Sequence, residues 1–368
     1  MGQYSLKGNK IEKEEGENDY LKFATFNAKG WKKQNDNTFT SKISIGNQQN
    51  LDVFCIFVGI NGNEISKFIN NHFYTELLYN INQTPEDMKI AIKKTFLRMN
   101  TLITEDKEEI AQLKLSNLNE EKQNQKKNVD IKEKETKIEL FEEDIEEIKN
   151  YTGCTACLVL IDENNKKLYF GNLGNTEAII YGKNEPIIFS SNHRPEDNSE
   201  NERILNKKST YNDDCGEADK SEEKNEKNKL IINHKLFGVL NTCRGFGNFG
   251  YIKPNEFLLF PYKVFSDEPD NILEYNIKDD DKYIFMGTET ILECIDKTKF
   301  VDLIKDSLTE TLEKILEDNI AYDFYNNDSE FGFDNITCTL IKIKNKEKKD
   351  EEKKEEVNKE DNKKEEII

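Results

Sequence analysis

The sequence predicts an α+β protein in which two antiparallel β-sheets are flanked by helices. Apolar, strand-like runs follow one another in groups, and the helix-like segments lie between these groups. A parallel sheet would need a helix after nearly every strand, so the grouping favours antiparallel sheets with separate helical layers. The 368 residues could form one large domain or two small ones, and they can bury a substantial core.

The N-terminal third begins with strands and continues with helices. Residues 20–45 alternate apolar and polar side chains, which predicts a hairpin or two edge strands. The apolar run LDVFCIF at 51–57 predicts a buried strand that ends in a glycine-containing turn. Apolar residues at helical spacing then predict one helix over about 63–81 and a second from Pro85, where acidic residues suit the helix dipole.

Two charged segments, at about 105–150 and 207–229, are expected to be insertions in the folded domain. Isoleucine and leucine are too sparse in the first segment for a core helix, so we expect a solvated helical insertion or a disordered loop there. A partner-binding helix around 138–148 is the alternative. Three apolar runs over 151–188 predict an antiparallel meander.

The C-terminal part of the domain returns to strands and a helix. A helix is predicted over about 298–319, and the predicted strands lie at 236–242, 257–265, 283–286 and 336–343. We place the domain at 20–343. Residues 1–19 are expected to be flexible, and the Lys/Glu repeat at 344–368 is expected to be disordered.

Composition limits the classes of partner. Charged residues make up 34% of the chain and the formal net charge is -19, so nucleic-acid phosphates would be repelled. The seven cysteines are scattered, mostly in apolar stretches, as expected for buried thiols in a reducing compartment. Cys154 and Cys157 form a C-x-x-C, but on a strand they would point to opposite faces, so we expect neither a zinc site nor a redox pair.

The sequence offers one candidate for membrane attachment. No apolar run reaches the roughly twenty residues that cross a bilayer, and there is no secretory signal, so we expect a cytoplasmic protein. Gly2 is a candidate acceptor for a myristoyl group, although the hydroxyl residue stands at Ser5 and not at position 6. One acyl chain gives weak, reversible attachment, so membrane association is expected only if Gly2 is acylated.

Several short segments, in one order along the chain, carry a family resemblance. They are TGCTA at 152–156, NLGNTEA at 172–178, HRP at 193–195 with ERI at 202–204, GVLNTCRGFGNF at 238–249, VFSDEP at 264–269 and FDNIT at 333–337. This ordered set resembles the type 2C metal-dependent protein Ser/Thr phosphatases, the PPM family. The resemblance covers about 20–343 without the two insertions. It implies the PPM-type sandwich of two antiparallel sheets flanked by helices.

The same resemblance implies a site with two Mg²⁺ or Mn²⁺ ions, held by carboxylates and one backbone carbonyl, with a bridging water as nucleophile. In the family motif F-D-G-H-G-G, the bridging Asp corresponds to Val58 and the His proposed as general acid to Ile60. Gly59 keeps the glycine whose carbonyl is a ligand. Asp334 is the one unaltered carboxylate ligand, and Glu289 stands in place of another Asp.

Other site positions depart from the family pattern as well. Lys32 corresponds to the phosphate-binding Arg; it keeps the charge and loses the bidentate fork, and it is our candidate phosphate-binding residue. The remaining departures are acidic positions that carry another acid or an amide, namely Asp36, Asn37, Asn175, Asn248 and Glu293.

These departures predict a degenerate, catalytically inactive member: a pseudophosphatase that binds a phosphoprotein or a regulatory partner. Valine at position 58 has no lone pair with which to bridge two cations, so the two-metal nucleophile should not form. Asp334, Glu289 and the Gly59 carbonyl make a remnant site for at most one weakly held Mg²⁺ or Mn²⁺. No tightly bound cofactor is expected.

Two alternatives stay open from the sequence. A divergent Mg²⁺- or Mn²⁺-dependent protein Ser/Thr phosphatase would hydrolyse phosphoserine or phosphothreonine with Glu289, Asp334, Glu293 and Asp36 in a rearranged site. An acidic, acylated scaffold would use its globular part only to present the charged segments. Arg244 and the D-N-I-T turn also suit packing and turn geometry, so they support the fold more than an activity.

Overall fold

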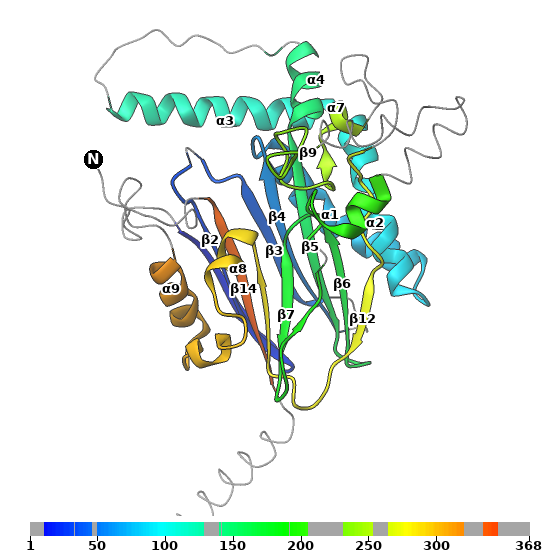
Figure 1. The fold of residues 1–368 in the computed structure, drawn as a ribbon, viewed down its shortest axis with the longest axis vertical. Helices are drawn as coiled ribbons and strands as arrows, with labels where there is room; N and C mark the ends of the chain where they lie inside the picture. Colours follow the sequence, from blue (N-terminus) through cyan, green and yellow to red (C-terminus); the bar gives the residue numbers. More distant parts are fainter. Residues whose placement is uncertain are drawn as a thin grey trace, which may run out of the picture.

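The computed structural model describes residues 11–32, 34–45, 50–128, 140, 142–190, 192–204, 231–252, 264–319 and 334–344. It confirms the predicted sandwich of two antiparallel sheets (Figure 1). Sheet 1 has the strand order β1 (Ile11–Glu17), β2 (Leu21–Ala28), β14 (Ile336–Ile343), β13 (Tyr283–Gly287), β7 (Glu177–Tyr181) and β8 (Ile187–Ile188). Sheet 2 has the order β12 (Leu273–Asn276), β6 (Lys167–Leu173), β5 (Gly153–Asp162), β4 (Leu51–Ile60) and β3 (Asn37–Ile45), and β11 (Phe246–Gly247) pairs with β5.

Helices cover the outer faces of both sheets (Figure 1). Sheet 2 carries α1 (Glu64–Gln83) and α2 (Met88–Glu105), and sheet 1 carries α8 (Glu289–Cys294) and α9 (Leu308–Asn319). The shorter or inserted elements are α3 (Lys107–Asn128), α4 (Glu142–Tyr151), β9 (Ile231–Ile232), β10 (Lys235–Leu236), α7 (Phe249–Ile252) and the 3-10 helix at Phe300–Leu303. No described helix is long and apolar enough to cross a membrane.

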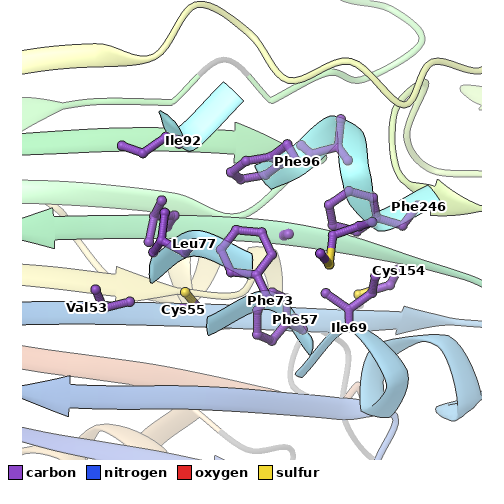
Figure 2. Close-up of a cluster of buried hydrophobic side chains, with 14 of the residues drawn as sticks. Val53, Cys55, Phe57, Ile69, Phe73, Leu77, Ile92, Phe96, Cys154 and Phe246 are labelled. Atoms are coloured by element: carbon purple, nitrogen blue, oxygen red, sulfur yellow. The ribbon is translucent and has the colours of Figure 1, made fainter. Parts of the chain in front are cut away.

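The largest core lies between sheet 2 and the helix pair α1 and α2 (Figure 2). Phe73 of α1 packs edge-on against Phe57 of β4, with ring centroids 5.4 Å apart, and against Phe96 of α2 at 5.1 Å. The apolar residues of α1 recur at helical spacing, so they share the face of the helix that packs on sheet 2. Helix α2 begins after Asp87, whose carboxylate accepts a hydrogen bond from the Ile90 N–H at 3.0 Å.

The two neighbouring cysteines of the C-x-x-C lie on opposite faces of β5, as predicted. Cys154 belongs to the core beneath α1 and α2, and Cys157 belongs to the core between the sheets. Burial raises the pKa of both thiols well above its ordinary value. Both are therefore buried apolar residues in this fold.

Of the two arrangements expected for residues 20–45, the hairpin is wrong, and two edge strands is right only for β3, because β2 lies between β1 and β14. Strand β2 lies in sheet 1 and β3 in sheet 2, so the two do not form a hairpin. The hairpin partner of β2 is β1, and the expectation that residues 1–19 are flexible is wrong for Ile11–Glu17. Strand β1 carries the charged sequence IEKEEGE at an edge of the sheet. Charged edge strands resist aggregation, and their composition resembles that of a solvated segment.

The predicted meander at 151–188 is correct only for its first two strands. Strands β5 and β6 pair in sheet 2, whereas β7 crosses to sheet 1 and pairs with β13. The predicted helix over 298–319 is shorter, since α9 begins at Leu308, and the strand predicted over 236–242 is reduced to β10. Turn signals mark where a strand ends, but they do not say which sheet the next strand joins. Segments 1–10, 207–229, 253–263 and 345–368 lie outside the described residues.

The first insertion is less solvated than its composition predicts. Ile110 of α3 and Ile148 of α4 join the core beneath α1 and α2. Asn117 of α3 is buried, and its amide oxygen accepts a hydrogen bond from Lys67 Nζ at 2.8 Å. Few apolar residues suffice because amide and charged contacts fasten α3 to α1. The solvated-insertion prediction is therefore wrong at these positions.

Asp52 is a buried carboxylate at the end of the sandwich where β4 begins. Its Oδ1 accepts hydrogen bonds from the Ser44 N–H and from Asn18 Nδ2, both at 2.9 Å. The same Asn18 amide donates to Glu163 at 2.7 Å, which brings two carboxylates together. Burial raises the pKa of Asp52 to about 7; the Ser44 hydrogen bond opposes this shift and the charge of Glu163 adds to it.

We expect Asp52→Asn to stabilise the protein increasingly between pH 4 and pH 7, with a constant advantage above pH 7. The folded-state pKa lies above the ordinary value of 3.8, so the wild-type carboxyl group contributes stability that is present below that value and lost as the pH rises through 7. The difference grows by up to about 1.4 kcal/mol per pH unit. Thermal melts across this range measure it, with exposed Asp279→Asn as control. A pH-independent difference would contradict the account.

Candidate functional site

The end of β4 and the start of β3 meet at one end of the sandwich, and the positions picked out by sequence meet there too. In the β3–β4 ladder Asn37 lies opposite Val58. The Gly59 N–H donates a hydrogen bond to the Asp36 carbonyl at 3.1 Å. Val58 is half-buried and packs against the apolar core between the sheets. An isopropyl group therefore stands where the resemblance implies the bridging carboxylate.

Gly59 is required here by close backbone packing. A Cβ at this position would lie 2.3 Å from the Gly62 carbonyl oxygen and 2.5 Å from that of Asp36. Neither backbone oxygen can move without displacing the turn. The glycine is thus explained without a metal ligand.

Ile60, at the position of the family's histidine, has a packing role. Its side chain contacts a small apolar cluster formed by Ile204, Leu236, Leu240, Cys243, Val264 and Phe265. These residues come from segments that follow β8 and precede β12. The contact holds this part of the chain against the tip of β4.

A network of buried amides and a hydroxyl lies beside Val58. Asn37 Nδ2 donates to Thr337 Oγ1 at 3.1 Å, and that hydroxyl donates to Asn27 Oδ1 at 2.9 Å. Asn27 Nδ2 donates to the Asn37 carbonyl at 3.1 Å, and Asn35 Nδ2 donates to Asn27 Oδ1 at 2.8 Å. Asn27 Nδ2 also donates to Glu12 Oε2 at 3.1 Å. The neutral amides themselves need no counter-ion, whereas buried carboxylates in their place would need a cation.

The two predicted carboxylate ligands are each paired with a cationic side chain. Asp334 Oδ1 lies 2.6 Å from Lys32 Nζ. Glu289 accepts hydrogen bonds from Arg194 and from Asn175, and Arg194 also contacts Glu293 at 2.5 Å. Lys32, Asp334, Glu289, Glu293 and Asn175 thus lie in the predicted region, but in two separate ion-pair groups.

Burial shifts the acidity of the site carboxylates. It raises the pKa of Glu289, an effect opposed by the charge of Arg194 and increased by that of Glu293. Burial also raises the pKa of Asp36, against the hydrogen bond from Gln34 and the charge of Lys32. Protonation of either carboxyl group would weaken it as a ligand for a hard cation.

The residues present do not fit a two-metal site. Within the described residues, no three His, Cys, Asp or Glu side chains form a group that could hold a metal ion. Asp334 and Glu289 are already engaged with Lys32 and Arg194, and Val58 offers no oxygen between them. The weak remnant site of Asp334, Glu289 and the Gly59 carbonyl stays a prediction, and both of its carboxylates are paired with cations in this structure.

Helix α3 adds a contact that the sequence did not predict. It crosses one end of the sandwich (Figure 1), and Asn117 Nδ2 donates to Asn63 Oδ1 at 2.6 Å and to Glu64 Oε1 at 3.0 Å. Lys114 pairs with the same buried Glu64 at 3.2 Å. The first insertion is thereby fastened to the turn that follows Val58.

A buried charge network supports the neighbouring loops. Arg244 donates to Glu200 through Nε at 2.8 Å and also through Nη2, and its Nη1 lies 2.8 Å from Asp270. Asp270 pairs with His193 Nε2 at 2.9 Å, while His193 Nδ1 accepts the Gly174 N–H at 2.9 Å. The structural role expected for Arg244 is evident in these contacts.

Arg194 and Glu200 are the residues that reasoning from the sequence missed. Arg194 lies inside the HRP segment, but its partner Glu289 is 95 residues away. Glu200 precedes ERI and is fully buried. A pattern of apolar and polar residues carries no signal for ion pairs between distant segments.

A comparison with models of known protein families identifies the family to which this chain belongs. The model of the family described as protein phosphatase 2C matches residues 99–327, which is more than half of the chain. The chain belongs to the protein phosphatase 2C family. Among curated relatives, the domain is 26% identical over 346 residues to "Probable protein phosphatase 2C 3" of Paramecium tetraurelia, with 89% of this chain and 94% of that protein covered. It is 25% identical over 360 residues to "Probable protein phosphatase 2C 21" of Arabidopsis thaliana, with 94% and 93% covered.

Solved structures show the same phosphatase 2C fold. The serine-threonine phosphatase 2C from Toxoplasma gondii matches with a TM-score of 0.54 and 13% identity, covering 90% of this chain and 99% of that one. A C. elegans sex determining protein matches with a TM-score of 0.57 and 14% identity, covering 91% of this chain and 64% of that chain. At these identities the likeness concerns the fold alone.

Proposed function

We propose that this phosphatase 2C domain is a pseudophosphatase that binds a phosphoprotein or a regulatory protein partner and does not turn it over. The observation that carries the proposal is Val58, which lies opposite Asn37 in the β3–β4 ladder. Neither side chain can act as an anionic bridge between two divalent cations. A water that bridges two metal ions, the nucleophile that the resemblance implies, would therefore have no carboxylate at position 58 to hold those ions.

The geometry supports binding through Lys32. Its ammonium group pairs with Asp334, and both side chains are about half exposed, at 42% and 51%. Exposed ion pairs contribute only about 0–1 kcal/mol, so a phosphate group could displace Asp334 from Lys32 at little cost. We therefore propose Lys32 as the contact for a phosphorylated side chain, with no tightly bound cofactor.

A metal-dependent protein Ser/Thr phosphatase is the second candidate. It is favoured by the family match and by the names of the curated relatives, which are phosphatases. It would have to use Asp36, Glu289, Glu293 and Asp334 after rearrangement of the Lys32 and Arg194 ion pairs. Metal-stimulated hydrolysis that is lost in Asp334→Ala would support this candidate and contradict the first.

Binding to phosphothreonine peptides tests the first candidate. We expect fluorescence polarisation to detect a phosphorylated peptide in a library without added metal, and Lys32→Met to weaken that binding about tenfold through loss of a charge-assisted contact. Lys42→Met is the control, because Lys42 is an exposed lysine of β3 that lies opposite Val53 and not at the Val58 end of the ladder. Binding that is unchanged in Lys32→Met, or that requires Mn²⁺, would contradict the proposed phosphate contact.

The proposal extends to where the protein is located in the cell. We propose a cytoplasmic protein that reaches membranes only when Gly2 is acylated. Gly2 directly follows Met1, as an N-myristoylation motif requires, and the residue lies outside the described part of the chain. Metabolic labelling with an alkyne-tagged myristate, compared with Gly2→Ala, tests it: absence of Gly2-dependent label would contradict the acylation.

A further inference from the structure

We infer that the side chains of Arg194 and Lys32 replace divalent cations as the counter-charges of this site, so that the fold holds its remaining carboxylates together without metal. The inference deepens the proposed function and rests on it for the loss of the metal pair. It assigns a positioning role to two cations that belong to the chain itself.

Arg194 bridges two carboxylates that would otherwise repel each other. Glu289 is the first residue of α8, and Glu293 lies one helical turn later on the same face. Arg194 Nη2 donates hydrogen bonds to both of these carboxylates. The side chains of Arg194 and Glu289 are only 28% and 24% exposed, so water screens the charges less than at the surface.

Lys32 makes the equivalent contact on the other side of the site. Its ammonium group pairs with Asp334, which precedes β14. Burial raises the pKa of the neighbouring Asp36, and the charge of Lys32 opposes this rise. The pair is more exposed than that of Arg194, and we expect a smaller contribution from it.

Charge balance favours this assignment. Val58, Asn37 and Asn175 are neutral where the resemblance implies carboxylates, so the site holds less negative charge than the family pattern implies. Asp334, Glu289 and Glu293 carry three negative charges, and Lys32 and Arg194 supply two positive charges in direct contact with them. The loss of anionic ligands therefore leaves these two side-chain cations as the counter-charges in contact with the remaining carboxylates.

Thermal melts of Arg194→Gln with and without Mn²⁺ test the inference. Millimolar Mn²⁺ should leave the wild-type melting temperature unchanged. Arg194→Gln leaves Glu289 and Glu293 without their cation, and we expect a melting temperature about 3 °C lower. Mn²⁺ should restore at least half of this loss, and NaCl of the same ionic strength should not.

Two further variants control the experiment. Arg98→Gln breaks an exposed pair with Glu105 on α2 and should neither melt lower nor respond to Mn²⁺. The double variant Arg194→Gln, Glu289→Gln removes the repulsion between Glu289 and Glu293, and its melting temperature should be higher than that of Arg194→Gln. This variant keeps the test usable if Arg194→Gln folds poorly. The inference is overturned if Mn²⁺ raises the wild-type melting temperature as much as that of Arg194→Gln, or if Arg194→Gln behaves like Arg98→Gln. Neither result depends on turnover, which separates this test from the proposed function.

Discussion

Replacing Arg244 with alanine is expected to lower the free energy of unfolding by about 3 kcal/mol, because it leaves a buried carboxylate without its main partner. The side chain of Glu200 is fully buried, and that of Arg244 is 12% exposed. Burial alone would disfavour the ionised form, but the hydrogen bonds from Arg244 and Arg203 outweigh it and lower the pKa of Glu200. Arg203 still contacts Glu200 in the variant, which keeps the loss near the lower end of the usual range.

Chemical denaturation of matched variants measures this effect. Glu200→Gln in the Arg244→Ala background should recover part of the loss, since no buried charge is left uncompensated. Arg98→Ala removes an arginine of an exposed ion pair and should cost no more than about 1 kcal/mol. Equal losses for Arg244→Ala and Arg98→Ala would show that the network around Glu200 does not stabilise the fold.

Replacing Gly59 with alanine is expected to cost about 3 kcal/mol, at the upper end of the usual range for overpacking. The added methyl group would meet two backbone carbonyl oxygens, those of Gly62 and Asp36, at 2.3 and 2.5 Å. Relief would require the β4 turn to move away from the loop before β3. That movement would also disturb the hydrogen bond from the Gly59 N–H to the Asp36 carbonyl.

The control for Gly59→Ala is Gly171→Ala on β6. A methyl group there would approach Ile272 Cδ1 and Phe96 Cε2 at 3.1 Å, and both belong to side chains that can adjust. Its loss should be clearly smaller in urea unfolding curves. Because packing explains Gly59, Mn²⁺ should not change the loss in either variant. A loss that appears only with Mn²⁺ present would mean that the Gly59 carbonyl holds a metal.

Local periodicity made much of the fold predictable. Strands β4 and β14 and helices α1 and α2 have apolar patterns that are complete within a short window, and the structure confirms them. Strand β1 was missed because its charged sequence belongs to an edge, and the packing of α3 was missed because Asn117 is held by amide contacts. Both elements are held in place by contacts with segments that are distant in sequence, and a local pattern does not report such contacts.

The candidate site was predictable as a place and not as a set of contacts. The resemblance carried by the short motifs predicted that Val58, Asn37 and Asp334 lie at one site. The β3–β4 register confirms that Val58 and Asn37 are neighbours. The cations were not predictable in their roles. The ion pairs of Lys32 and Arg194 carry no local signal, because their partners Asp334 and Glu289 lie far away in sequence.

The central claim is that the site no longer assembles a metal pair and therefore does not hydrolyse phosphate esters. Titration calorimetry with Mn²⁺ on the purified protein, with turnover of p-nitrophenyl phosphate assayed on the same sample, tests it most directly. We predict no heat of tight binding and no turnover above that of Asp334→Ala. Stoichiometric Mn²⁺ binding together with turnover that Asp334→Ala abolishes would contradict the claim and establish a divergent metal-dependent phosphatase.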